Sequence, residues 1–242
     1  MSVTKEELNR IAQEYHEKDQ MLDKHIEDEC QYYTYDWVFS KLSPGDSVLE
    51  MGYGEGNFTE ALVKRNFLPT VIDGSGILLD KAASLYGSRI KTVHALFEEY
   101  TPKDRFDCVL ATHVLEHVDD PVALLKKMKT WIKPNGKIII IVPNKESLHR
   151  QLAVIMKLQP ALDTLGDRDK LVGHQRVYSI SSLSADVLTS GLKVQESAGF
   201  FLKTLPNSMM LGYSKELIIA LNKISPLLPK ELLANIGLIA VN

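Results

Sequence analysis

Three glycines at every second position, Gly52, Gly54 and Gly56, stand between a short apolar run and a segment that can form a helix. Glycines permit a tight turn and a close approach of the main chain to a ligand, and the start of a helix presents free N–H groups. Asp73 ends the next apolar run, where an acid is placed to bind both hydroxyls of a ribose. The spacing therefore predicts a nucleoside site.

The position of the last glycine in the loop distinguishes a dinucleotide site from a site for another nucleoside. A dinucleotide loop follows the pattern G-x-G-x-x-G, which would put its final glycine where Asn57 stands here. Glu50, just before the loop, would oppose a pyrophosphate but would suit a ligand with a cationic amino-acid part. An NAD-dependent oxidoreductase stays an alternative, but both observations favour a nucleoside that carries an amino acid.

Strand and helix signals alternate through the middle of the chain. Buried strands are expected at Ser47–Met51, Thr70–Asp73, Ile90–His94, Asp107–Ala111, Lys137–Val142, Lys193–Phe201 and Ile236–Val241. Helices are expected between and beyond them at Asn57–Arg65, Ile77–Tyr86, Pro121–Ile132, Glu146–Leu158 and Ser181–Thr189. This order predicts an α/β, Rossmann-like, doubly wound sheet of seven mainly parallel strands.

Helical segments flank this core. Amphipathic helices are expected at Ser2–Lys18 and Ile26–Lys41, a polar lid loop at Asp163–Gln175, and an apolar helical insertion at Met209–Leu233. We expect one domain over residues 1–242. Its parts are a helical cap at 1–41, a core that binds the nucleoside at 42–144, and a half for the second substrate at 145–242 with the insertion near 209–233.

Five segments in order resemble the motifs of class I S-adenosylmethionine-dependent methyltransferases. They are the glycine loop at Glu50–Gly56, Val71–Asp73, Ala95–Glu98, Phe106–Val118 with its Val-Leu-Glu-His-Val ending, and Trp131–Val142. One such loop would be weak evidence, whereas five motifs in the right order are specific. The resemblance implies a methyl-transferring enzyme whose cofactor is S-adenosyl-L-methionine and whose product is S-adenosyl-L-homocysteine.

The same resemblance implies which residues contact the cofactor. It assigns the methionine part to Glu50, Gly52, Gly54 and Thr112, the ribose to Asp73, and the adenine to Leu96 and Phe97. For Glu98, a contact with the adenine and a position facing solvent both stay open.

His113, Glu116 and His117 have the spacing of one helical face, if a helix begins there. We interpret His113 as a base or as a contact with the methyl acceptor. In ubiquinone-pathway O-methyltransferases, acidic and His residues here can hold a divalent metal, but this chain has His at the first of those positions. Because few oxygen ligands accompany them, Glu116 and His117 are interpreted as loop-holding residues, and no metal site is expected.

His174, Arg176 and Tyr178 alternate along the chain, so an extended segment would place them on one side. We interpret the three as part of the acceptor pocket. Arg176 would favour an anionic acceptor that it binds bidentately. The alternative is a surface loop with an arginine salt bridge.

The composition bounds the remaining functions. The chain has 242 residues, a net charge of −3 and 45% hydrophobic residues, which excludes wholesale disorder and argues against a nucleic-acid clamp. Apolar runs such as Ile138–Val142 are too short to span a membrane. The charged N-terminus resembles no signal peptide, and Cys30 and Cys108 form no CxxC pair. We expect a cytoplasmic protein without nucleic-acid or membrane partners; a homodimer stays open.

The leading prediction is a small-molecule methyltransferase of a biosynthetic pathway. Its acceptor would be an oxygen of a sugar, a phosphonate-like group or another polar or anionic molecule. Two alternatives stay open: a protein that binds S-adenosylmethionine without catalysis, and an N-methyltransferase of an amino sugar.

Overall fold

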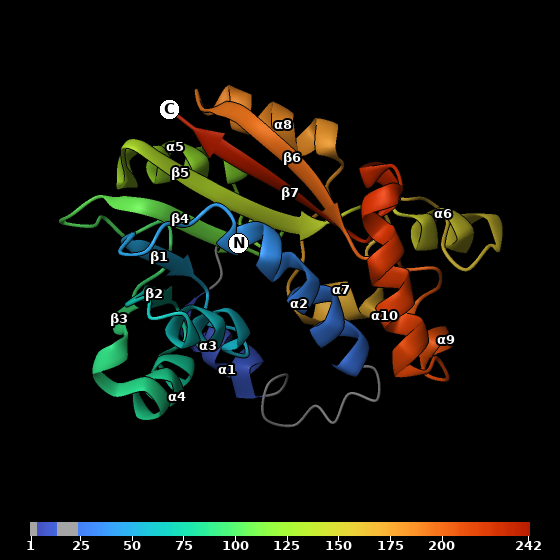
Figure 1. Ribbon diagram of the computed structural model, residues 1–242, viewed down its shortest axis with the longest axis horizontal. Coiled ribbons are helices and arrows are strands. Elements are labelled where there is room, and N and C mark those ends of the chain that lie inside the picture. The colour runs from blue at the N-terminus through green and yellow to red at the C-terminus, as the bar shows by residue number, and fades with distance from the viewer. Residues whose placement is uncertain (1–3, 14–23) are drawn as a thin grey trace.

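The computed structural model describes residues 4–13 and 24–242, and their strands form a seven-stranded sheet (Figure 1). The strands are β1 (Val48–Met51), β2 (Thr70–Asp73), β3 (Lys91–His94), β4 (Phe106–Thr112), β5 (Ile132–Pro143), β6 (Lys193–Phe200) and β7 (Asn235–Val241). Their order across the sheet is β3-β2-β1-β4-β5-β7-β6. Only β7 is antiparallel to its neighbours, β5 and β6. The predicted Rossmann-like, mainly parallel sheet is therefore confirmed.

Helices cover both faces of the sheet (Figure 1). They are α1 (Lys5–Ile11), α2 (Lys24–Phe39), α3 (Asn57–Lys64), α4 (Gly76–Tyr86), α5 (Pro121–Trp131), α6 (Leu148–Ile155), α7 (Asp167–Leu171), α8 (Ile180–Thr189), α9 (Asn207–Met210) and α10 (Lys215–Ile224). One core cluster joins the sheet to α5 and α8, and a second joins its other face to α2 and α3. The helix boundaries follow local signals such as the capping box that Ser179 and Ser182 form at the start of α8.

The interior strand β5 shows why a continuous apolar run forms a strand here. Ile138, Ile140 and Val142 face the cluster with α5 and α8, whereas Ile139 and Ile141 face the cluster with α2 and α3. Side chains of successive strand residues point to opposite faces, so a strand covered by helices on both sides needs apolar residues throughout.

The carboxyl ends of β1, β2 and β4 meet at one edge of the sheet because these strands are parallel and adjacent. Met51, Asp73 and Thr112 are their last residues. The glycine loop, the acid after β2 and the turn after β4 therefore lie together, as is usual for ligand sites in open α/β sheets.

Some predicted elements differ from the structure. The strand predicted at Lys137–Val142 begins earlier, at Ile132, and the register jumps from Phe106–Ile132 to Cys108–Lys137, so that residues 133–136 form a bulge within β5. The expected lid loop contains the short helix α7. The insertion is divided into α9, α10 and two 3-10 turns, of which one contains Pro226 and the other begins after Pro229. The predicted helix Ser2–Lys18 is described over residues 4–13, which include α1, and its positions 2–3 and 14–18 lie outside the described residues. No helix in the described ranges has the length and apolar character needed to cross a bilayer.

Candidate active site

A cavity of about 770 Å³ opens at the carboxyl edge of the sheet. Its glycine-loop end is lined by residues that include Glu50, Gly52, Gly54, Asp73, Leu96 and Phe97. Its histidine end is lined by residues that include His113, His117, His149, Arg150, Asp169, His174 and Lys203. Thr112, the last residue of β4, also lines this cavity. The structure thus brings all seven predicted cofactor residues to one cavity, together with His113 and His174.

The glycine loop keeps its main chain accessible. Gly52, Gly54 and Gly56 have φ values of +80°, +53° and +85°, which other residues rarely adopt. A Cβ at Gly54 would meet no atom within 4 Å, so this residue faces open space in the cavity wall. A Cβ at Gly56 would lie 2.4 Å from the Tyr53 hydroxyl, so Gly56 gives the Tyr53 ring room to pack below the loop.

Asp73 joins the glycine loop to the end of β2. Its Oδ2 accepts a hydrogen bond from the Tyr53 N–H at 2.8 Å, and its Oδ1 accepts one from the Ser75 N–H at 2.7 Å. The residue is 8% exposed and lines the cavity. The two main-chain donors hold the carboxylate in one orientation at the wall.

Glu50 is a buried acid below the same loop. Burial raises its pKa to about 8, although the hydrogen bond from Thr59 Oγ1 to Glu50 Oε2, at 2.7 Å, opposes this change. The nearby Asp73 adds to the rise because a second negative charge disfavours ionisation. A cation bound in the cavity would favour the ionised form of Glu50.

The helix α1 covers the part of the cavity lined by Leu96 and Phe97. Leu8 packs so closely on Gly74 that a Cβ there would lie 2.3 Å from Leu8 Cδ1. Asn9 Oδ1 accepts a hydrogen bond from Ser75 Oγ at 2.8 Å, which fixes α1 to the start of α4. The amphipathic pattern predicted this helix but not its place over the cavity.

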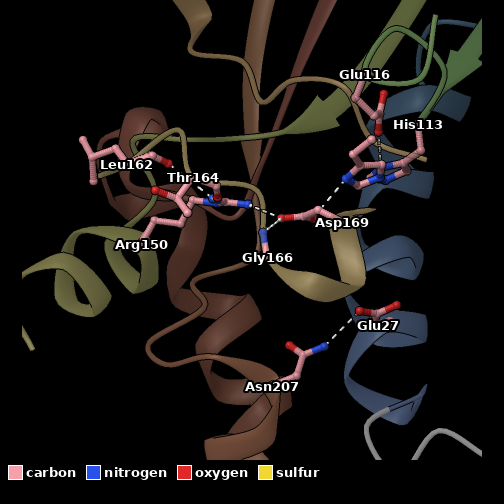
Figure 2. Close-up of polar contacts among 10 residues, drawn as sticks. Glu27, His113, Glu116, Arg150, Leu162, Thr164, Gly166, Asp169 and Asn207 are labelled. Carbon is pink, nitrogen blue, oxygen red and sulfur yellow. Dashed lines mark hydrogen bonds and ion pairs between the residues drawn. The ribbon is translucent and has the colours of Figure 1, made fainter. Parts of the chain in front are cut away.

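The turn after β4 carries the first histidine–carboxylate pair. His113 Nδ1 lies 3.1 Å from Glu116 Oε1 (Figure 2). The expected helix does not begin at His113, because that residue has a left-handed φ of +55° and α5 starts only at Pro121. The turn nevertheless brings the two side chains together, and 34% of the His113 side chain is exposed, on the cavity side.

The charges of this pair support each other. Burial would raise the pKa of Glu116, but the contact with His113 holds it below its ordinary value. Burial would lower the pKa of His113, but the hydrogen bond and the charge of Glu116 raise it. Glu116 is fully buried, and its Oε2 has no hydrogen-bond partner among the described residues. The pair therefore combines a buried ionised carboxylate with an imidazole at the cavity wall.

A second histidine–carboxylate pair lies at the same end of the cavity. His174 Nδ1 is 3.0 Å from Asp169 Oδ1, and the His174 ring meets the His117 ring edge to face with a centroid distance of 4.6 Å. Burial lowers the pKa of His117, and the neighbouring His174 adds to this. Two imidazoles, His113 and His174, thus share the cavity, each with a carboxylate behind it.

The structure does not bring Arg176 and Tyr178 to this cavity. Arg176 donates from Nη1 to the carbonyl oxygens of Leu115, at 2.9 Å, and Val118, and from Nη2 to that of Asp119, at 3.1 Å. The Tyr178 hydroxyl donates to Asp186 at 3.1 Å, and the ring is buried in the core. Both side chains hold chain segments together. The predicted grouping of the three side chains in one pocket is therefore wrong, because only His174 of the three lines the cavity.

Glu116, His117 and His174 place one ligand-type atom each within 4.8 Å of one another. Among the described residues they are the group whose spacing would suit an ion. Glu116 Oε1 and His174 Nδ1 are already engaged by His113 and Asp169. The expectation that no metal is needed stays a prediction.

Sequence reasoning missed four residues of the histidine end: His149, Arg150, Asp169 and Lys203. Burial lowers the pKa of His149 to about 2, and the charges of Lys203 and Arg150 act in the same direction. No motif marks these residues. The acid five positions before His174 was a weak signal, and it was overlooked within a polar stretch interpreted as a lid loop.

Comparison with known families identifies the family to which the chain belongs. A family described as a methyltransferase domain matches residues 22–197 of the chain. The chain belongs to this methyltransferase family. It is an S-adenosylmethionine-dependent methyltransferase, as the five motifs suggested.

Relatives and solved structures agree with this assignment. The methyltransferase is 26% identical over 189 residues to a ubiquinone biosynthesis O-methyltransferase of Aeromonas salmonicida, covering 73% of this chain and 76% of that protein. It shares its fold with a possible histamine N-methyltransferase of Thermotoga maritima, at TM-score 0.62 and 16% identity, over 97% of this chain and 99% of the other. The 1,6-didemethyltoxoflavin-N1-methyltransferase of Burkholderia thailandensis, solved with S-adenosylhomocysteine, aligns at TM-score 0.56 and 15% identity over 96% of this chain and 84% of the other.

Proposed function

We propose that this methyltransferase transfers the methyl group to a phenol-type hydroxyl bound at the histidine end, with His113 as general base. The observation that carries the proposal is the 3.1 Å contact between His113 and the buried Glu116, next to Thr112 at the cavity wall. A carboxylate behind an imidazole orients the ring and leaves Nε2 as a proton acceptor.

The glycine-loop end fits S-adenosylmethionine. When bound, this cofactor supplies an electrophilic methyl group on a sulfonium centre. Gly54 leaves space for a ligand at the main chain, Asp73 offers an oriented carboxylate, and Glu50 offers a buried acid whose ionisation a cation would favour. We assign the methionine part to Glu50, Gly52, Gly54 and Thr112, the ribose to Asp73, and the adenine to Leu96 and Phe97 beneath α1.

The base identifies the class of hydroxyl. An imidazole with a pKa near neutrality can take a proton from a phenol, whose pKa is about 10, far more easily than from an aliphatic alcohol. His113 Nε2 would accept that proton, and Glu116 would stabilise the imidazolium that forms. Relatives named as O-methyltransferases favour oxygen as the acceptor atom. Nothing in the structure or the comparisons supports the sugar or phosphonate acceptor expected from the sequence.

Release of S-adenosylhomocysteine tests the proposal with a panel of acceptors: phenol, catechol, methyl glucoside, methylphosphonate and glucosamine. We expect turnover with the phenols. Asparagine tolerates the left-handed φ of position 113, so the His113→Asn variant should keep its fold. Its rate of methyl transfer should fall about 100- to 10,000-fold. Asp107→Asn, which removes a carboxylate paired with Lys133 away from the cavity, is the matched control.

Three results would count against this function: a His113→Asn variant that keeps its rate, turnover of glucosamine alone, or turnover that EDTA stops and a divalent ion restores. The last result would indicate that a metal ion held by Glu116, His117 and His174 activates the hydroxyl as a Lewis acid, in place of the base His113.

A further inference from the structure

The side chain of Arg150, in α6, organises the segment that leads to His174. Its Nη1 donates to the carbonyl oxygens of Leu162, at 3.2 Å, and Thr164, at 2.9 Å, and its Nη2 lies 3.1 Å from Asp169 Oδ2 (Figure 2). Only 11% of the Arg150 side chain is exposed. A guanidinium is a rigid fork of donors, so this one side chain fixes both the turn before α7 and the carboxylate within it.

Asp169 passes this constraint on to His174. Its Oδ2 also accepts the Gly166 N–H at 2.9 Å, its Oδ1 lies 3.0 Å from His174 Nδ1, and its carbonyl oxygen accepts the His174 N–H at 2.7 Å. Burial would raise the pKa of Asp169, but the hydrogen bonds from His174 and Gly166 and the charge of Arg150 hold it well below its ordinary value. An ionised carboxylate has no proton to donate, so the proton between Asp169 and a neutral His174 belongs to His174 Nδ1.

We propose that Asp169 and Arg150 are positioning residues, which fix the His174 imidazole as the tautomer protonated at Nδ1. The Nε2 lone pair is then left to accept a hydrogen bond from the methyl acceptor. His174 lines the same cavity as His113 and packs against His117, so the second imidazole complements the base on the acceptor side. The role of His174 toward the acceptor rests on the proposed function, whereas the assignment of its tautomer is independent of that function.

The tautomer is read directly from the ¹⁵N NMR signals of the histidine rings in the full chain, with the His174 signals assigned by their loss in His174→Gln. In Asp169→Asn, the side-chain carbonyl should stay with the Arg150 and Gly166 donors, which turns the amide NH₂ toward His174 Nδ1. The proton must then move to Nε2. We expect His174 to be protonated at Nδ1 in the native protein and at Nε2 in Asp169→Asn, and to be a mixture in Arg150→Met. Asp107→Asn should leave the His174 signals unchanged.

The kinetic counterpart separates positioning from general structural damage. With phenol or catechol as the acceptor, Asp169→Asn should lower kcat/KM about 100-fold, while the Kd of S-adenosylhomocysteine stays within twofold. Asp169→Glu, which keeps the acceptor-only chemistry, should restore part of the loss and the native tautomer.

An unchanged His174 tautomer in Asp169→Asn would overturn the proposal. So would a switched tautomer with unchanged acceptor kinetics, or with an equal loss of cofactor affinity. If no hydroxyl in the panel is methylated by the native protein, the proposed function fails, and the NMR result still decides the positioning role because it needs no acceptor.

Discussion

The two ends of the cavity are built from different parts of the chain. The glycine-loop end presents mostly main chain, and its conformation depends on glycines with positive φ within five residues. The histidine end presents side chains that are held by other side chains, in part from a separate segment, as Arg150 holds Asp169, 19 positions later. A main-chain site tolerates many changes that keep its φ angles and its open space, whereas a side-chain site depends on each partner.

The ends also differ in how their acids are held. At the glycine-loop end, burial raises the pKa of Glu50 to about 8. At the histidine end, imidazole and guanidinium neighbours keep the pKa values of Glu116 and Asp169 below their ordinary values despite burial. The histidine end therefore supplies its own cations, whereas Glu50 would gain from a cationic ligand.

The largest effect should come from filling the open space of the glycine-loop end. Gly54→Arg places a long side chain in the cavity wall, and we expect it to abolish binding of S-adenosylhomocysteine in calorimetry. Gly87→Arg is a matched control, because Gly87 has the same φ of +53° and open space but does not line the cavity. If both variants bind alike, the glycine-loop end is not a main-chain site.

Asp73→Ala should have the next largest effect, because it removes charge-assisted hydrogen bonds at the same end. We expect cofactor affinity to fall by about 1–3 kcal/mol, or roughly 5- to 150-fold. The exposed Asp80→Ala, in α4, should leave the affinity unchanged. If the Kd of Asp73→Ala equals that of the native protein, Asp73 does not bind the ribose of the cofactor.

Arg176→Ala tests how the histidine end is supported. Arg176 donates to the turn after β4 but does not line the cavity. Three carbonyl oxygens lose a donor, and we expect the free energy of unfolding in urea to fall by about 1–3 kcal/mol. The exposed Arg89→Ala should change it by less than about 0.5 kcal/mol. A raised acceptor KM at unchanged stability would instead return Arg176 to acceptor binding.

Glu50 should make the stability of the protein depend on pH. Because its pKa is about 8 in the folded protein and near 4.5 otherwise, the folded state binds the extra proton between these values. Stability should therefore decline as pH rises from about 4.5 to about 8. Glu50→Gln should remove this decline and make the protein more stable than the native chain at pH 9, by up to about 5 kcal/mol. Parallel stability profiles for the two proteins would show that Glu50 ionises freely.

The extent to which the sequence predicted the molecule follows the same division. The apolar segments that alternate with helical segments predicted the positions of all seven strands. The motifs predicted that Gly54, Asp73 and Thr112 contact one ligand, and all three residues line the same cavity. The i, i+3 spacing paired His113 with Glu116, although through a turn and not through a helix.

What the sequence determined by itself is local: strand periodicity, glycines whose φ angles other residues rarely adopt, and the order of the motifs. These follow from backbone geometry within a few residues. Only the tertiary structure decided the partners that come from distant segments. Arg176 donates to the carbonyl oxygens of a turn about 60 positions away, and Arg150 donates to Asp169, 19 positions along the chain. Such pairs form between groups that folding brings together, and no spacing along the chain encodes that distance.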